Sequence, residues 1–109
     1  MKYADKIKEI VENDEVVLFI KGTAKQPLCG FSARAVNILN QLKVIFIDMN
    51  ILDDHPAIAL ELRELYGWPT SPQLFVRGKL IGGSDIMAEL YQSGELQKLL
   101  GVPVVYPQA

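Results

Sequence analysis

The sequence predicts an α/β fold with a four-stranded mixed sheet flanked by helices on both faces. A β-branched and aromatic run at residues 16–20 is typical of one strand, and an apolar run at residues 44–48 is typical of another. Apolar residues at helical spacing separate the two runs, which predicts a βαβ unit with parallel strands. Two short strand-like runs on either side of Gly78 predict an antiparallel hairpin. The predicted order is β-α-β-α-β-β-α, with one helix before it and one after.

The first half of the chain contains two predicted helices and two predicted strands. Residues 3–13 form an amphipathic helix, with Ile7, Ile10 and Val11 on one face and charged residues opposite. Strand 16–20 follows, and residues 21–28 form a loop. The second helix spans residues 31–42, and its apolar face consists of Phe31, Ala35, Ile38, Leu39 and Leu42. The apolar run at 44–48 is typical of a strand buried on both faces.

The second half begins with a turn at residues 53–56. We expect His55, the single histidine, to be an exposed turn residue without a catalytic or metal-binding role. The third helix ends at Gly67, and its apolar residues are Ile58, Leu62, Leu65 and Tyr66. Residues 68–72 contain two prolines and are not helical. Strands 73–77 and 80–81 follow, joined by a hairpin turn at Gly78 and Lys79.

Residues 82–85 are glycine-rich and lead into a fourth helix. Its inward residues are Ile86, Met87, Leu90 and Tyr91. A last short helix spans 93–100, and the proline-containing tail from residue 102 has no regular structure. With 109 residues, 50% of them hydrophobic, and neither a repeat nor a linker, the sequence predicts one domain over 1–109, with a core of about 3–100 and a tail of 102–109.

Composition argues against several classes of function. Lys and Arg total 11 against 13 Asp and Glu, so the net charge of -2 offers no basic surface for nucleic acid. No apolar segment reaches the roughly 18 residues that a membrane span requires. The single cysteine excludes an intramolecular disulfide and indicates a reducing compartment. We expect the cytoplasm, or a mitochondrial or plastid matrix if a transit peptide has been removed.

The cysteine itself, Cys29, lies between a strand and a helix. A helix N-terminus favours an anion there, and Lys21 and Lys25 add positive charge, so we expect a reactive thiolate. The alternative is a small buried core cysteine, which the flanking Pro27, Gly30 and Ser32 disfavour. In open α/β sheets the ligand crevice lies beyond the carboxyl ends of the parallel strands, where this loop is placed. The loops at residues 70–72 and 82–85 are expected to converge on it.

Four motifs, in order and at matching separations, together resemble one family over residues 3–100. They are Lys21-Gly22-Thr23, Cys29-Gly30-Phe31-Ser32, Trp68-Pro69-Thr70-x-Pro72-Gln73 and Gly82-Gly83-x-Asp85. The set resembles the monothiol glutaredoxins of the CGFS type. The resemblance implies a thioredoxin-like, or glutaredoxin, fold.

The resemblance also implies a function. Ser32 stands where dithiol relatives have a second cysteine, so no internal disulfide forms and disulfide reductase activity is expected to be weak. The family binds a [2Fe-2S] cluster, which requires four thiolates. With Cys29 as the one protein ligand per chain, a homodimer with two glutathione molecules supplies them. The implied role is a carrier that passes clusters to iron-sulfur apoproteins and pairs with a BolA-like protein.

Two other classes of function stay open from the sequence. One is a glutathione-dependent deglutathionylating oxidoreductase, in which the Cys29 thiolate attacks a mixed disulfide and a second glutathione resolves it. The other is a redox-inactive interaction module.

The resemblance implies that six residues of this chain recognise glutathione. The resemblance implies that Lys21 pairs with the glycine carboxylate and that Pro72, in cis, presents the backbone of Ser71 to the cysteinyl unit. Gly83 and the helix N-terminus near Ser84 suit the γ-glutamyl carboxylate, and Asp85 accepts from the amino group. Taken singly, Lys21 could be a solvated lysine, Pro72 a turn former, and the last two residues a helix cap.

The chain departs from the family at three positions. Ala59 stands where the family usually has an arginine that holds the glycine carboxylate, which puts the strength of glutathione binding in doubt. Arg63, one turn further on, either compensates or pairs with Glu61 or Glu64. Ser71 replaces a common apolar residue before the proline, and Ser84 replaces a frequent cysteine.

Overall fold

The computed structural model describes residues 3–54, 56–68 and 70–104 of the chain. In chain order its elements are α1 (Ala4–Asn13), β1 (Val16–Ile20), α2 (Gly30–Gln41), β2 (Ile47–Asn50), the 3-10 helix η1 (Ile51–Asp54), α3 (Ala57–Tyr66), β3 (Gln73–Val76), β4 (Lys79–Gly82), α4 (Ser84–Ser93) and α5 (Glu95–Leu100).

The four strands form one mixed sheet in the order β2-β1-β3-β4. Strands β1 and β2 are parallel, whereas β1 with β3 and β3 with β4 are antiparallel. This confirms the predicted βαβ pair and the predicted hairpin. Strand β1 is therefore central, and its carboxyl end leads into the loop that precedes the cysteine.

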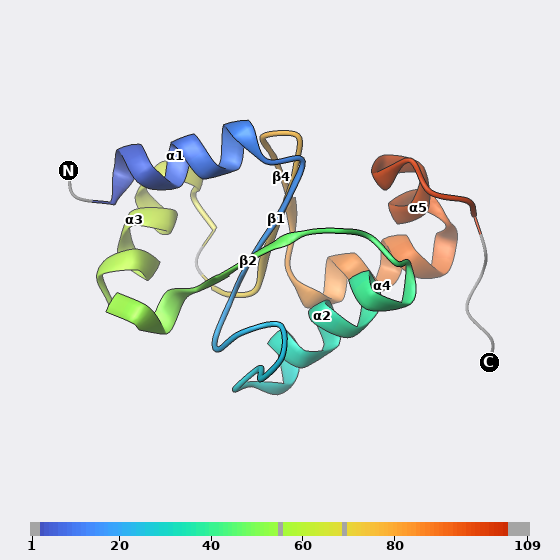
Figure 1. Cartoon of the computed structure of the whole chain (residues 1–109), viewed down its shortest axis with the longest axis horizontal. Helices are drawn as coiled ribbons and strands as arrows, with labels where there is room; N and C mark the ends of the chain where they lie inside the picture. Colours follow the sequence, from blue (N-terminus) through green and yellow to red (C-terminus); the bar gives the residue numbers. More distant parts are fainter. Residues whose placement is uncertain (1–2, 55, 69, 105–109) are drawn as a thin grey trace.

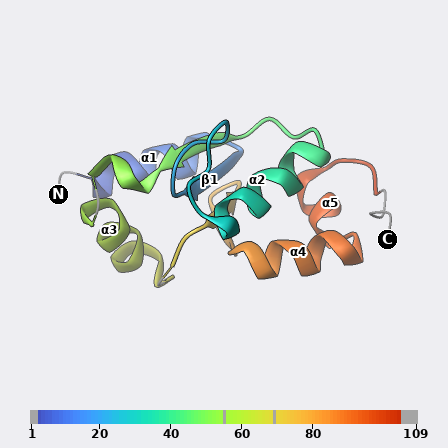
Figure 2. The same cartoon turned by 90° about the horizontal axis from the view of Figure 1, so that it is seen from below.

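Helices cover both faces of the sheet, as the sequence predicts. Figures 1 and 2 show α1 and α3 on one side and α2, α4 and α5 on the other. Because successive strand residues point to opposite faces, β1 supplies both cores. Val17 and Phe19 pack with α1 and α3, and Val16, Leu18 and Ile20 pack with the other three helices. All five side chains are buried, which accounts for the continuous apolar run of this strand.

The prediction that the apolar run at residues 44–48 is a strand buried on both faces is wrong. The strand begins only at Ile47 and ends at Asn50, and it lies at the edge of the sheet. Ile45 precedes the strand with 93% of its surface exposed, and Ile47 is 40% exposed. An edge strand has a neighbour on one side only, so fewer of its apolar side chains are covered.

Other boundaries differ by a residue or two. The hairpin turn is Arg77–Gly78, one residue earlier than predicted, with positive φ at both positions (47° and 81°) as a two-residue type I′ turn requires. Helix α3 ends at Gly67 as predicted, with φ 74° and its N–H bonded to the Arg63 carbonyl at 2.8 Å. Asp53 and Asp54 of the predicted turn at 53–56 are the end of η1, and the prediction for His55 lies outside the described residues.

Residues 102–104 of the predicted tail have neither helix nor strand. Within the described part of the chain, no helix is long and apolar enough to cross a membrane.

Candidate functional site

Cys29 is the N-cap residue of α2, with an extended backbone (φ -151°, ψ 147°) and a partly exposed side chain. The backbone N–H of Ser32 lowers the pKa of the thiol below its ordinary value, and burial opposes this in part. The Ser32 hydroxyl, the Phe31 N–H and the charge of Lys21 lower that pKa further. The open N–H groups of the first helical turn therefore stabilise the thiolate, as the sequence predicts.

Ser32 also fixes the loop before the cysteine. Its side chain is fully buried, and its hydroxyl accepts a hydrogen bond from the Lys21 N–H at 3.1 Å. The Leu28 N–H donates to the Lys21 carbonyl at 2.9 Å, which closes residues 21–28 into a compact loop. At Gly22, where φ is +95°, a Cβ would lie 2.5 Å from the Gln26 carbonyl, so this tight loop requires glycine.

Two polar side chains of β2 accept hydrogen bonds from the backbone of the same loop, and the sequence analysis identified neither of them. The Asn50 side chain accepts from the Gly22 N–H at 3.0 Å, and the Asp48 carboxylate accepts from the Ala24 N–H at 2.7 Å. Their position in the second strand of the predicted βαβ unit, near its carboxyl end, is the sequence feature that could have indicated this role. The loop therefore lies against the carboxyl end of the parallel pair.

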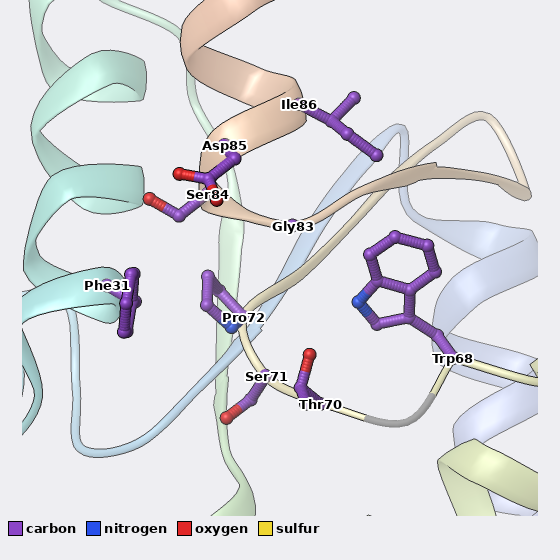
Figure 3. Close-up of a pocket in the computed structure, with 9 residues that line it drawn as sticks. All are labelled: Phe31, Trp68, Thr70, Ser71, Pro72, Gly83, Ser84, Asp85 and Ile86. Carbon is purple, nitrogen blue, oxygen red and sulfur yellow. The ribbon is translucent and has the colours of Figure 1, made fainter.

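A cavity of about 440 Å³ opens beside the amino end of α2. It is lined by Phe31, Trp68, Thr70, Ser71, Pro72, Gly83, Ser84, Asp85 and Ile86. Figure 3 shows the Phe31 ring on one side, the Trp68 indole on the other, and Pro72 with Gly83 between them. The Ser71–Pro72 peptide bond is cis, which confirms that prediction.

The sequence prediction placed Phe31 on the apolar face of α2, and this is wrong. Its ring is 59% exposed and lines the cavity instead. It is the second residue of α2, which begins at Gly30. Leu28, on the other side of Cys29, is 63% exposed, so an apolar rim flanks the thiol.

The Gly83 and Asp85 side of the cavity is the amino end of α4. A Cβ at Gly83 would lie 3.2 Å from the Pro72 carbonyl, so glycine lets the two loops approach closely. The Asp85 carboxylate is exposed and accepts from the Arg34 guanidinium at 3.0 Å, which connects α4 to α2. Sequence reasoning missed Arg34, because 51 residues separate the pair.

A second, smaller cavity of about 180 Å³ adjoins the first, and we call it the side cavity. It is lined by Lys21, Ile51, Ala59, Leu62, Thr70, Ser71 and Gln73, so it shares Thr70 and Ser71 with the first cavity. Ala59 therefore faces the side cavity. Arg63 is exposed and lines neither cavity.

Six of the predicted site residues line one or both cavities: Lys21, Ser71, Pro72, Gly83, Ser84 and Asp85. Cys29 adjoins this set through Phe31, which lines the first cavity, and through Lys21, whose charge acts on the thiol. The arrangement can place an extended, zwitterionic small molecule beside a thiolate.

Comparison with known proteins identifies the family. The glutaredoxin family model matches residues 16–81. The probable monothiol glutaredoxin 2 of Rickettsia conorii is 51% identical over 94 residues, which cover 86% of this chain and 87% of that protein. The chain belongs to the monothiol glutaredoxins. The resemblance inferred from the four motifs is thereby confirmed.

Solved glutaredoxins share the architecture. The solution structure of reduced poplar apo GrxS14 superposes with a TM-score of 0.78 at 42% identity, covering 89% of this chain and 88% of that one. The crystal structure of a buckwheat glutaredoxin–glutathione complex gives a TM-score of 0.81 at 26% identity, covering 92% and 88%. The predicted thioredoxin-like glutaredoxin fold is therefore confirmed.

Proposed function

We propose that this monothiol glutaredoxin binds glutathione along the two joined cavities and carries a [2Fe-2S] cluster between proteins. The observation that carries the proposal is the position of a single, acidified thiol, Cys29, beside a crevice with charged or polar groups at both ends. The glutathione complex of the buckwheat glutaredoxin supports the choice of ligand.

In this proposal glutathione lies extended over the Thr70–Ser71 segment that both cavities share. Its glycine carboxylate meets Lys21 in the side cavity. Its γ-glutamyl end meets the amino end of α4, where helix N–H groups suit the carboxylate and Asp85 accepts from the amino group. The backbone of Ser71, before the cis proline, pairs with the cysteinyl unit.

The residues present fit a shared cluster. A [2Fe-2S] cluster takes four thiolates, and the chain has one cysteine. Among the described residues no group of three or more His, Cys, Asp or Glu side chains could hold a metal within one chain. In this proposal two Cys29 thiolates and two glutathione thiolates make up the set, as the family resemblance implies, and the holo form is a homodimer.

The Cys29→Ser variant tests the proposal. We expect it to lose the visible absorbance that the parent gains on anaerobic reconstitution with iron, sulfide and glutathione, because a hydroxyl is a poor iron ligand. The parent should also double its mass in size-exclusion chromatography on cluster assembly, and the variant should stay monomeric. Its circular dichroism should match the parent, because Cys29 is partly exposed and belongs to neither hydrophobic core. A variant that keeps the absorbance would contradict the proposal.

The lowered pKa of the thiol favours a second candidate function, glutathione-dependent deglutathionylation. There the Cys29 thiolate attacks the glutathione sulfur of a mixed disulfide, the client thiolate leaves, and a second glutathione reduces the Cys29–glutathione disulfide to give oxidised glutathione. A colourless reconstituted protein with rapid mixed-disulfide turnover would favour this enzyme over the carrier.

As a carrier, the protein receives clusters from a scaffold and passes them to iron-sulfur apoproteins. We also propose a BolA-like partner, which the family resemblance implies. The location that suits a free, reactive thiol is a reducing one, and we propose the cytoplasm.

A further inference from the structure

The lining of the side cavity includes a buried polar atom that has no hydrogen-bond partner among the described residues. Gln73, the first residue of β3, is 2% exposed. Its amide nitrogen donates to the Thr70 carbonyl at 2.9 Å and to the Trp68 carbonyl at 3.3 Å. Because both neighbours are acceptors, the nitrogen must face them, and the oxygen must face the other way. That oxygen makes no hydrogen bond within the described part of the chain.

A second buried polar atom belongs to the lining of the same cavity. The Ser71 hydroxyl makes no hydrogen bond with the described residues either, and Figure 3 shows it pointing away from the Trp68 indole. Buried polar groups are rarely left unpaired, because each costs about 1–3 kcal/mol. The Gln73 oxygen can only accept, so the matching group on a ligand is an N–H or O–H donor.

The space beside these two atoms comes from small side chains. Ala59 and Ser71 both line the side cavity, and both have short side chains. Ile51 and Leu62 add buried apolar side chains to the lining, and the exposed Lys21 adds a cation. A volume of about 180 Å³ exceeds the roughly 30 Å³ that one water occupies, so a small substituent fits beside a carboxylate.

We propose that the side cavity is a subsite for a C-terminal residue larger than glycine, one that bears a hydrogen-bond donor, in a γ-glutamyl-cysteinyl tripeptide thiol. This inference rests on the proposed glutathione-type binding, in which Lys21 pairs with the terminal carboxylate. A serine in the third position places a hydroxymethyl group next to that carboxylate. Its O–H donates to Gln73, and its methylene fills the space that Ala59 leaves.

The test compares three S-methylated tripeptides, γ-Glu-Cys-Gly, γ-Glu-Cys-Ala and γ-Glu-Cys-Ser. Binding is followed by the fluorescence of Trp68, the single tryptophan, which lines the adjoining cavity. We expect the serine peptide to bind roughly three- to tenfold more tightly than the alanine peptide, as one added hydrogen bond allows. The alanine peptide separates the effect of the donor from that of size.

Two variants of α3 locate the effect. Ala59→Leu fills the side cavity and should remove the preference for the serine peptide over the glycine peptide. Ala57→Leu, on the same helix but outside the cavity lining, should keep the parent's preference. Equal affinity of the parent for all three peptides would overturn the inference and leave the proposed function standing. Failure of all three peptides to bind would overturn both.

Discussion

The Ser32 hydroxyl makes two contacts at once. It accepts from the Lys21 N–H, and its hydrogen bond to Cys29 lowers the pKa of the thiol. The Ser32 backbone N–H contributes more to that pKa than the charge of Lys21 does. Ser32 therefore connects loop geometry to thiol acidity, although in the sequence it is notable only as the position of a lost second cysteine.

The Ser32→Ala variant should raise the pKa of Cys29, because the thiolate loses one hydrogen-bond donor. The rate of alkylation by iodoacetamide, measured against pH, should show its midpoint at a higher pH than in the parent. Ser93→Ala is the control, since Ser93 lies at the far end of α4 and its hydroxyl bonds to the Leu90 carbonyl. An unchanged midpoint in Ser32→Ala would contradict a contribution of the Ser32 hydroxyl to the acidity of Cys29.

The same pKa shift makes stability depend on pH. The thiol pKa is lower in the folded chain than the usual value of about 8.5 in an unfolded one. The stabilising contribution is therefore fully present above the unfolded pKa and is lost as pH falls through the folded pKa. Urea midpoints of the parent minus those of Cys29→Ala should thus rise with pH in this window, and a flat difference would contradict the shift.

Lys21 is the single cation that lines the side cavity among the described residues, so in the proposed complex it alone pairs with the terminal carboxylate. A hydrogen bond to a charged group contributes about 1.5–3 kcal/mol. Lys21→Ala should therefore raise the glutathione concentration needed for half-maximal cluster absorbance roughly tenfold or more. Lys25→Ala, on the same loop but outside both cavities, should change it little. A similar effect of both changes would indicate general charge attraction.

At the scale of elements, the edge strand β2 supports the loop at residues 21–28, which precedes Cys29. The Asn50 side chain accepts both the Gly22 N–H at 3.0 Å and the Leu52 N–H at 2.9 Å, so it connects the loop to the start of η1. We expect Asn50→Ala to lower the free energy of unfolding by about 1–3 kcal/mol, measured by urea titration, because the partly buried Gly22 N–H loses its partner.

Asn37→Ala is the matched control for Asn50→Ala. Asn37 is exposed on α2, and alanine favours the helix, so this variant should be as stable as the parent or slightly more so. Equal losses in the two variants would mean that the Asn50 bonds contribute nothing measurable.

Strand β2 also shows what sequence patterns do not determine. Apolar content predicted a strand near residues 44–48, and the parallel pairing with β1 is confirmed. The extent of burial depends on strand order, because only the order places β2 at an edge, and no local pattern encodes it. The one-residue error at the hairpin has a local cause, since Arg77 adopts a positive φ that is uncommon for its type.

The candidate site likewise contains residues that the sequence could place and contacts that it could not. Residues within contiguous motifs, such as Cys29 and Pro72, could be placed from the sequence because each motif is one loop. The contacts of Asp48, Asn50 and Arg34 join positions 24 to 51 residues apart, so only the folded chain brings them together. The side cavity likewise depends on how α3 packs beside the loop before β3.

At the scale of the whole molecule, one sheet joins the two hydrophobic cores. Leu18 faces one core and Phe19 the other, so neither core can open without disrupting β1. Leu18→Ala and Phe19→Ala should each lower stability by about 2–5 kcal/mol. In both variants, far-ultraviolet circular dichroism and Trp68 fluorescence should report coincident urea transitions. Separate transitions would mean that the two sides unfold independently.

The exposed edge at β2 has a consequence for work with the purified protein. An outermost strand has backbone groups that can pair with another molecule. Ile45, just before β2, is 93% exposed, and Ile47, its first residue, is 40% exposed. Self-association through this edge depends on protein concentration but needs no glutathione, and it should respond to replacement of Ile45 by lysine. Size-exclusion chromatography at several dilutions, with and without glutathione, therefore distinguishes self-association through β2 from the proposed dimer at Cys29.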